Sequence, residues 1–217
     1  MPNVILQDLN AVIHGTSKHG LEYDIAHVTI LLQTDVPIPT ELEWAIPHVE
    51  DIPQKAINFI KDGTTPIYPM LKSKLRDGLS DFLTNIDSNN MAGTLEDIEQ
   101  ALLLTSMHIT PLEALENNDC RYIISYKYRL YPVAKDTFDF KVLLPFDGLV
   151  LHPAGGKLQV TLVSPIGAII DPTITDAKNF EGQTVANEEI APIALVGKQV
   201  VSFEIHQDPI FTIRYHY

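Results

Sequence analysis

An alternation of apolar and polar residues over residues 120–131 is the strongest structural constraint in this sequence. Successive side chains of a β-strand point to opposite faces of a sheet, so a period of two residues predicts a strand with one buried face. The polar positions are Arg121, Ser125, Lys127 and Arg129. The residues expected on the buried face are Tyr122, Ile124, Tyr126, Tyr128 and Leu130.

The same alternation returns in four later segments. Clusters of Gly, Pro, Asp and Ser separate them, and such clusters favour tight turns. A series of short strands joined by turns is typical of an antiparallel β-sandwich, and we expect a sandwich-like module over residues 119–217. The Cys, Trp, Cys pattern of antibody domains is absent from the sequence. The four segments are 138–144, 158–162, 201–205 and 211–217.

Residues 1–50 also have the pattern of strands. An apolar run over 3–13 and a β-rich run over 23–32 flank the polar turn sequence HGTSKHG. In the second run the apolar residues change phase near Ala26 and His27, so one face stays buried only if a β-bulge lies there. We expect these strands to be able to pair with the C-terminal sheet.

Residues 51–118 show the 3 and 4 spacing of amphipathic helices. The clearest example has Thr94 as its N-cap, and Thr110 followed by Pro111 and Glu113 matches a further helix start. We expect three to four helices here, beginning near residues 52, 69, 94 and 110. The predicted fold class is therefore α+β, with N-terminal strands over 1–50, a helical unit over 51–118 and an antiparallel β-sandwich-like module over 119–217.

Charge and cysteine content exclude several classes of protein. A net charge of −13 opposes the Lys and Arg contacts to phosphate on which nucleic-acid binding depends, so we expect no nucleic-acid partner. The N-terminus lacks a secretory signal, and no apolar run approaches the ~20 residues that span a bilayer, so we expect no membrane partner. Cys120 is the single cysteine. We expect a cytoplasmic protein, or one assembled into a particle made in the cytoplasm.

The sequence holds no complete motif for catalysis or cofactor binding. The segment 15–20 lacks the lysine and hydroxyl of a phosphate loop, and His14, His19 and His27 lack the spacing of zinc ligands. We expect no cofactor, no metal and no catalytic residue. Two weaker possibilities stay open: an oxygen-rich loop over 171–189 that suits Ca²⁺, and acidic pairs at 50/51, 96/97 and 188/189.

Six of the eight tyrosines lie in the first and last strands of the predicted sandwich. Tyrosine combines a large apolar ring with a polar hydroxyl, which suits it to protein interfaces as well as to the edge of a core. Both interpretations stay open on the sequence. The candidate interface residues are Tyr122, Tyr126, Tyr128, Tyr131, Tyr215 and Tyr217.

These observations favour a non-enzymatic structural or assembly protein, for example a subunit of a virion or tail-like particle. Its expected partners are further copies of itself or other protein subunits, bound through the tyrosines or through open strand edges. One alternative is a β-sandwich module whose loops at 145–157 and 164–199 bind a carbohydrate, a peptide or Ca²⁺. A second alternative is an enzyme with an acidic pair between the helical and β units.

Overall fold

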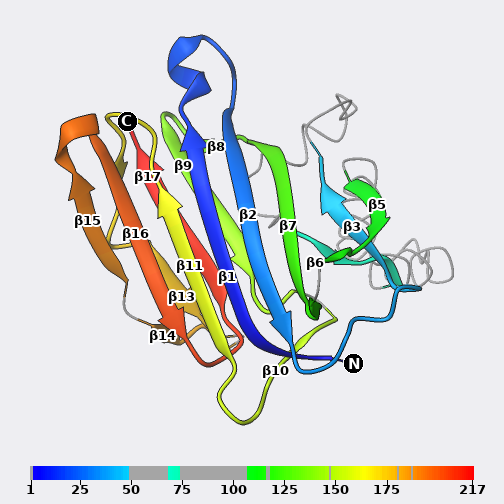
Figure 1. Cartoon of the computed structure of the whole chain (residues 1–217). Helices are drawn as coiled ribbons and strands as arrows, with labels where there is room; N and C mark the ends of the chain where they lie inside the picture. Colours follow the sequence, from blue (N-terminus) through cyan, green and yellow to red (C-terminus); the bar gives the residue numbers. More distant parts are fainter. Residues whose placement is uncertain are drawn as a thin grey trace, which may run out of the picture.

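The computed structural model describes residues 2–48, 68–73, 107–115, 118–146, 148–179, 181–186 and 188–217. The described residues are nearly all β, with 61% of them in strands and 6% helical. Figure 1 shows that the strands form two large layers, one in front of the other, with a small sheet at one side. Candidate functional side chains among the described residues are therefore carried mainly by strands and by the turns that join them.

The front layer is an eight-stranded sheet in the part of the chain that is described. Two N-terminal strands lie at its centre, where one of them pairs antiparallel with the other and parallel with a C-terminal strand. A short strand β10 (Val150–Leu151) pairs with β1. The main order is β15 (Glu189–Ile193), β16 (Lys198–Ile205), β11 (Lys157–Val163), β1 (Asn3–His14), β2 (Asp24–Thr34), β7 (Asn118–Leu130) and β6 (Ala114–Leu115).

The second layer packs face to face against the first. The ring of Phe203 on β16 meets Phe211 on β17 at 5.3 Å between centroids, and Tyr128 on β7 lies 6.3 Å from Phe140 on β9. Aromatic contacts across the two layers make this a β-sandwich core. Its described order is β14 (Thr184–Ala186), β13 (Asp176–Lys178), β17 (Ile210–His216), β9 (Thr137–Leu143) and β8 (Pro132–Ala134), with β12 (Ile169–Ile170) beside β17.

The alternation predicted for residues 120–131 is confirmed by the burial of β7, but the bulge predicted near Ala26 and His27 is wrong. The pairing of β1 with β2 is regular from Leu6 to His14. On β2 the buried face is Asp24, Ala26, Val28, Ile30, Leu32 and Thr34. Ala26 thus keeps the phase of the core, because a buried aspartate takes the position before it and no shift of phase is needed.

The third sheet is small and lies beside β7. Its order is β4 (Met70–Leu71), β3 (Glu43–Pro47) and β5 (Met107–Pro111). Trp44 on β3 is fully buried, and its ring lies 6.4 Å from that of Phe146. This sheet ties two distant parts of the sequence to the sandwich, since β3 follows β2 and β5 precedes β7.

The α+β fold class, with three to four helices over 51–118, is wrong. Thr110 and Pro111, which match a helix N-terminus in sequence, belong to β5 and pair with Trp44 and Glu43 of β3. Strand pairing with a distant segment overrides a local capping signal of about 1 kcal/mol. Met70 and Leu71 likewise form β4 where a helix was expected to begin. Lys72 and Ser73, which follow β4, are helical. Residues 51–67, 74–106 and 116–117 of the predicted helical unit lie outside the described residues.

Candidate functional site

The six tyrosines predicted as a candidate interface do not form an exposed face. Their rings pack against one another and against phenylalanines, as in the stacked pair of Phe138 and Tyr215 at 5.2 Å. Tyr217 is half-buried. These rings therefore build the core and present little surface to a partner in this fold. The five that are buried are Tyr122, Tyr126, Tyr128, Tyr131 and Tyr215.

The buried carboxylate of Asp24 joins three segments of the chain. Its Oδ1 accepts hydrogen bonds from the backbone N–H and the hydroxyl of Ser17, at 2.9 and 2.6 Å. Ser17 belongs to the 3-10 helix η1 (Thr16–His19) between β1 and β2. Oδ2 accepts hydrogen bonds from the hydroxyls of Tyr215 and Tyr217, each at 2.7 Å. We call these four residues the Asp24 cluster.

The hydrogen bonds of the Asp24 cluster hold the turn after β1 against the C-terminal strand. Burial raises the pKa of the Tyr215 hydroxyl well above its ordinary value, and the neighbouring Asp24 carboxylate adds to the shift. Burial and the hydrogen bond to Asp24 also raise the pKa of Tyr217. Both phenols therefore remain donors at neutral pH. Every bond of the cluster serves to hold η1 against the last strand.

Three aliphatic side chains are exposed together at this end of the sandwich. Ile166, in the turn after β11, is 65% exposed, Leu195 is 100% exposed and Val196 is 50% exposed. Leu195 and Val196 lie in the 3-10 helix η2 (Ala194–Val196). The two turns are joined, because the N–H of Gly167 donates to the carbonyl of Gly197 at 2.7 Å. We call Ile166, Leu195 and Val196 the tip.

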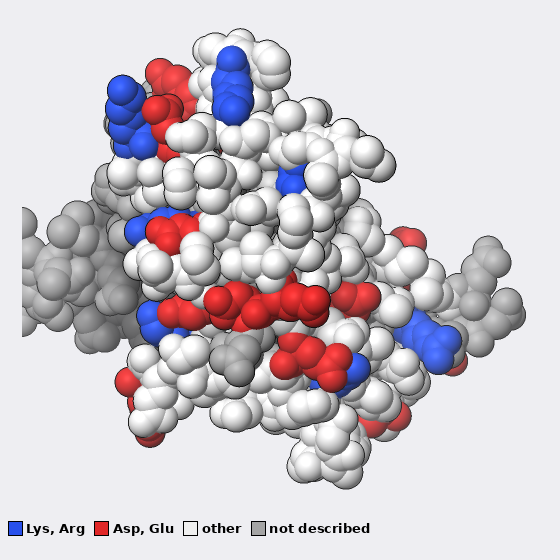
Figure 2. Space-filling model, turned by 90° about the vertical axis from the view of Figure 1, so that its left-hand side faces the viewer, with Lys and Arg blue, Asp and Glu red and all other residues white. Residues whose placement is uncertain are grey.

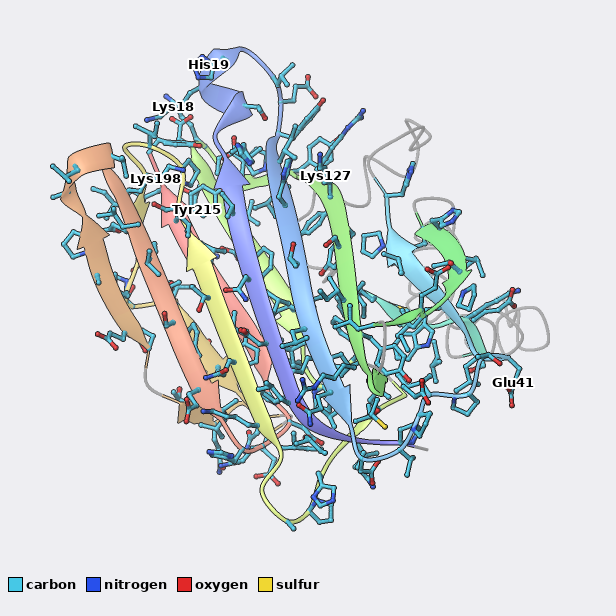
Figure 3. All side chains as sticks on the ribbon, in the orientation of Figure 1. Lys18, His19, Glu41, Lys127, Lys198 and Tyr215 are labelled. Carbon is cyan, nitrogen blue, oxygen red and sulfur yellow. The ribbon has the colours of Figure 1, made fainter. Side chains whose placement is uncertain are left out.

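A groove of about 550 Å³ lies beside the tip and includes Ile166 in its wall. Lys18 crosses it, with its Nζ 4.2 Å from the centre of the Tyr217 ring and 3.4 Å from the carbonyl oxygen of Ile166. None of the described residues that line it is an Asp or Glu. Figure 3 shows Lys18, His19 and Lys198 at this end of the molecule. We call it the basic groove, and its ionisable lining residues are His14, Lys18, His19 and Lys198.

A second groove, of about 680 Å³, lies on the outer face of the large sheet. Glu204 at its border pairs with Lys157 at 2.8 Å and accepts a hydrogen bond from Gln159 at 3.1 Å, and these two donors lower the pKa of Glu204. Its lining, in the part of the chain that the structure describes, contains no Lys or Arg. Figure 2 views the molecule from the edge where β15 lies and shows a band of acidic side chains there. We call it the acidic groove, and its acidic lining residues are Asp8, Glu188, Glu189 and Glu204.

The histidines that are loosely clustered in sequence are partly brought together. The rings of His14 on β1 and His27 on β2 lie 4.4 Å apart, and His19 lines the basic groove with His14. Burial, and then the charges of His14 and Lys127, lower the pKa of His27. Across the described ranges, no group of three or more His, Cys, Asp or Glu side chains is arranged to hold a metal ion.

The other sequence candidates do not converge on a site. In the oxygen-rich loop, Asp171 accepts hydrogen bonds from the N–H and hydroxyl of Thr173, and Asn179 accepts two from backbone N–H groups. These oxygens serve local turns. The pair Glu188 and Glu189 lines the acidic groove. The pairs at 50/51 and 96/97 lie outside the described residues.

The tip is the feature that the sequence analysis missed. Its residues stand in segments assigned to turns, where apolar side chains carry no periodic signal. Single exposed hydrophobic residues are common, so only their spatial grouping is informative.

In the segments described here, no helix is long and apolar enough to cross a membrane.

No protein-family profile matches the chain, and no curated protein matches it. Among solved structures, the chain aligns over its full length with 76% of the yeast delta-COP-I mu-homology domain complexed with a Dsl1 WxWxV peptide, at 10% identity and a TM-score of 0.21. A TM-score of this size does not establish a common fold.

Proposed function

We propose that this chain is a non-enzymatic assembly protein that docks onto protein surfaces through the tip. The observation that carries the proposal is the joint exposure of Ile166, Leu195 and Val196 on two turns that are hydrogen-bonded to each other. Grouped apolar residues with a polar border are typical of protein-interaction sites. A subunit of a virion or tail-like particle would be one form of such a protein.

The charge around the tip specifies the chemistry of the partner. Lys18 and Lys198 line the basic groove next to Ile166, whereas the chain as a whole has a net charge of −13. A local basic region on an acidic protein attracts an acidic surface and repels a basic one. The partner surface is therefore acidic.

Docking by side chains fits the described sheet edges better than strand addition does. Pro192 lies on β15 at one edge of the large sheet, and Pro132 begins β8 at one edge of the second sheet. Proline has no N–H to donate to an added strand, and it is a common protection of sheet edges. The opposite edge of the large sheet is β6, which spans only Ala114–Leu115.

Light scattering behind size-exclusion chromatography tests the proposal over a hundredfold range of protein concentration. We expect the wild-type mass to rise to a multiple of the chain mass. Val196→Asp places a charge in the docking surface and should raise the dissociation constant by more than about tenfold, because a central apolar contact is lost and the charge is desolvated.

Val36→Asp is the matched control, since Val36 is 51% exposed and Val196 is 50% exposed. Val36 lies in the segment after β2, away from the tip residues in sequence, and its variant should associate like the wild type. A wild type that is monomeric at every concentration contradicts the proposal, as does equal loss of association in both variants.

A further inference from the structure

We propose that the surface bound by the tip and the basic groove is the acidic groove of a second copy of this chain, in a closed two-fold dimer. The inference rests on the proposed function, because it names the partner of the same docking surface. It is argued from where the two grooves lie on the large sheet, from their opposite charges and from what symmetry does with two such patches.

The two grooves lie on one face of the same strand. On β16 the side chains of Val201, Phe203 and Ile205 enter the core, so the alternate positions face outward. Lys198, which lines the basic groove, and Glu204, which lines the acidic groove, both hold such positions. At about 3.3 Å per residue they are about 20 Å apart along the strand.

The neighbouring strand extends the acidic groove at the sheet edge. Glu189 on β15 pairs with Ser202 on β16, and Ser202 is also a lining residue of the acidic groove. Between the two grooves on β16 lies the outward position of Val200, which pairs with Val163 of β11 and with Ala191 of β15. A partly apolar strip thus separates a basic patch from an acidic patch on one continuous surface.

Charge complementarity selects this pairing over others. Among the described lining residues, the basic groove has no Asp or Glu and the acidic groove has no Lys or Arg. Lys157, which lies next to the acidic groove, pairs with Glu204. Two chains of net charge −13 repel each other on average, so contact requires that lysines meet carboxylates locally. At physiological salt the Debye length is about 8 Å, so charges farther apart than this are largely screened. Pairs of lysine and carboxylate in close contact therefore contribute more to association than the net charge does.

Symmetry turns the two patches into a single self-complementary interface. In a two-fold dimer, any residue i of one copy that contacts residue j of the other implies the reverse contact as well. When a basic and an acidic patch lie side by side on one face, each patch of one copy meets the opposite patch of its partner. The dimer is closed, so we expect the mass to stop at two chains.

A charge-swap experiment on the full chain tests this arrangement. The first variant carries Lys18→Glu and Lys198→Glu, and the second carries Glu188→Lys and Glu189→Lys. Each variant alone sets like charges against each other twice, so its dissociation constant should rise about tenfold or more. Mixed in equal amounts, the variants are complementary at both contacts, so they should form a one-to-one heterodimer, detected by native mass spectrometry with one variant mass-labelled.

The outcomes separate this inference from the proposed function. One outcome is that Val196→Asp prevents association while both charge variants still associate with themselves like the wild type. In that case the tip is a docking surface, but the acidic groove of a second copy is not its partner. If the mixture forms no heterodimer while both variants keep the wild-type circular dichroism spectrum, the inference is also overturned. If Val196→Asp has no effect, both proposals fail. Because Lys18 contacts Tyr217 and Ile166, Lys198→Glu alone serves as the second basic-groove variant.

Discussion

The Asp24 cluster and the tip lie at the same end of the sandwich, yet they differ in how their groups are satisfied. In the cluster a fully buried carboxylate accepts four hydrogen bonds, from Ser17, Tyr215 and Tyr217. At the tip, Leu195 is 100% exposed. The residue between them is Lys18, which follows Ser17 and crosses the basic groove.

This difference distinguishes the residues that hold the fold from those that are available to bind a partner. Buried polar groups are stable only when they are hydrogen-bonded, so a fully satisfied cluster is a sign of a structural role. Exposed apolar groups gain free energy only when something covers them. The cluster therefore positions η1, and through it Lys18, while the tip and the basic groove form the contact surface that we propose.

The largest effect is expected from removal of the central carboxylate. Asp24→Ala leaves the donors of Ser17, Tyr215 and Tyr217 without their acceptor at a buried position, and should lower the free energy of unfolding by about 3 kcal/mol or more. Urea denaturation measures the change. Glu41→Ala, at an exposed position, is the control and should stay within about 0.5 kcal/mol of the wild type. An equal effect of both would remove the structural role of the cluster.

A smaller effect is expected from single hydroxyl groups, and it differs between two buried tyrosines. Tyr215→Phe removes a hydrogen bond to Asp24 and should cost about 1–2 kcal/mol of unfolding free energy. The buried Tyr126 hydroxyl has no hydrogen-bond partner among the described residues, so Tyr126→Phe should be neutral or slightly stabilising. A reversed order of the two variants in urea denaturation would contradict the hydrogen-bond assignment.

The smallest effect concerns pH and the pair of His14 and His27. The pKa of His27 is lowered in the folded chain by burial and by the charges of His14 and Lys127. The unfolded chain then binds more protons, so stability falls as pH drops below the unfolded value of about 6.5 toward the folded pKa. His27→Gln should flatten the stability profile between about pH 7.5 and 5.5. The comparison is made in urea at several pH values.

Carboxylates and His27 contribute to folding stability in different ranges of pH. Asp35, Asp171 and Glu204 have pKa values lowered by hydrogen bonds, so the stability they contribute is lost only at more acid pH, as they become protonated. A wild type and a His27→Gln variant with the same slope above about pH 5.5 would show that His27 does not titrate differently on folding.

The sequence predicted the strand at residues 120–131 because one face of β7 is fully buried, which leaves a clear period of two. It did not predict the burial of Asp24, because Tyr215 lies 191 residues away along the chain. The same lack of long-range information led to the wrong prediction of a bulge near Ala26. At Thr110 and Pro111 a local helix signal was real, but pairing with β3 decided the structure.

The sequence predicted the candidate site even less well than it predicted the fold. Tyrosines carry a compositional signal that suits both core and interface, and here five of six are buried. The sequence around Ile166, Leu195 and Val196 has no pattern that predicts an exposed group. These side chains are grouped only because the two turns are hydrogen-bonded through Gly167 and Gly197. Only the folded arrangement brings them together with Lys18 and Lys198.

The most direct test of the docking role of the tip is a dilution series followed by methyl NMR on protein labelled at Ile, Leu and Val. We expect the largest concentration-dependent shifts at the methyl groups of Ile166, Leu195 and Val196, with those of the buried Val28 and Ile124 unchanged. Shifts that are absent at the tip, or that are largest elsewhere on the molecule, would contradict the account.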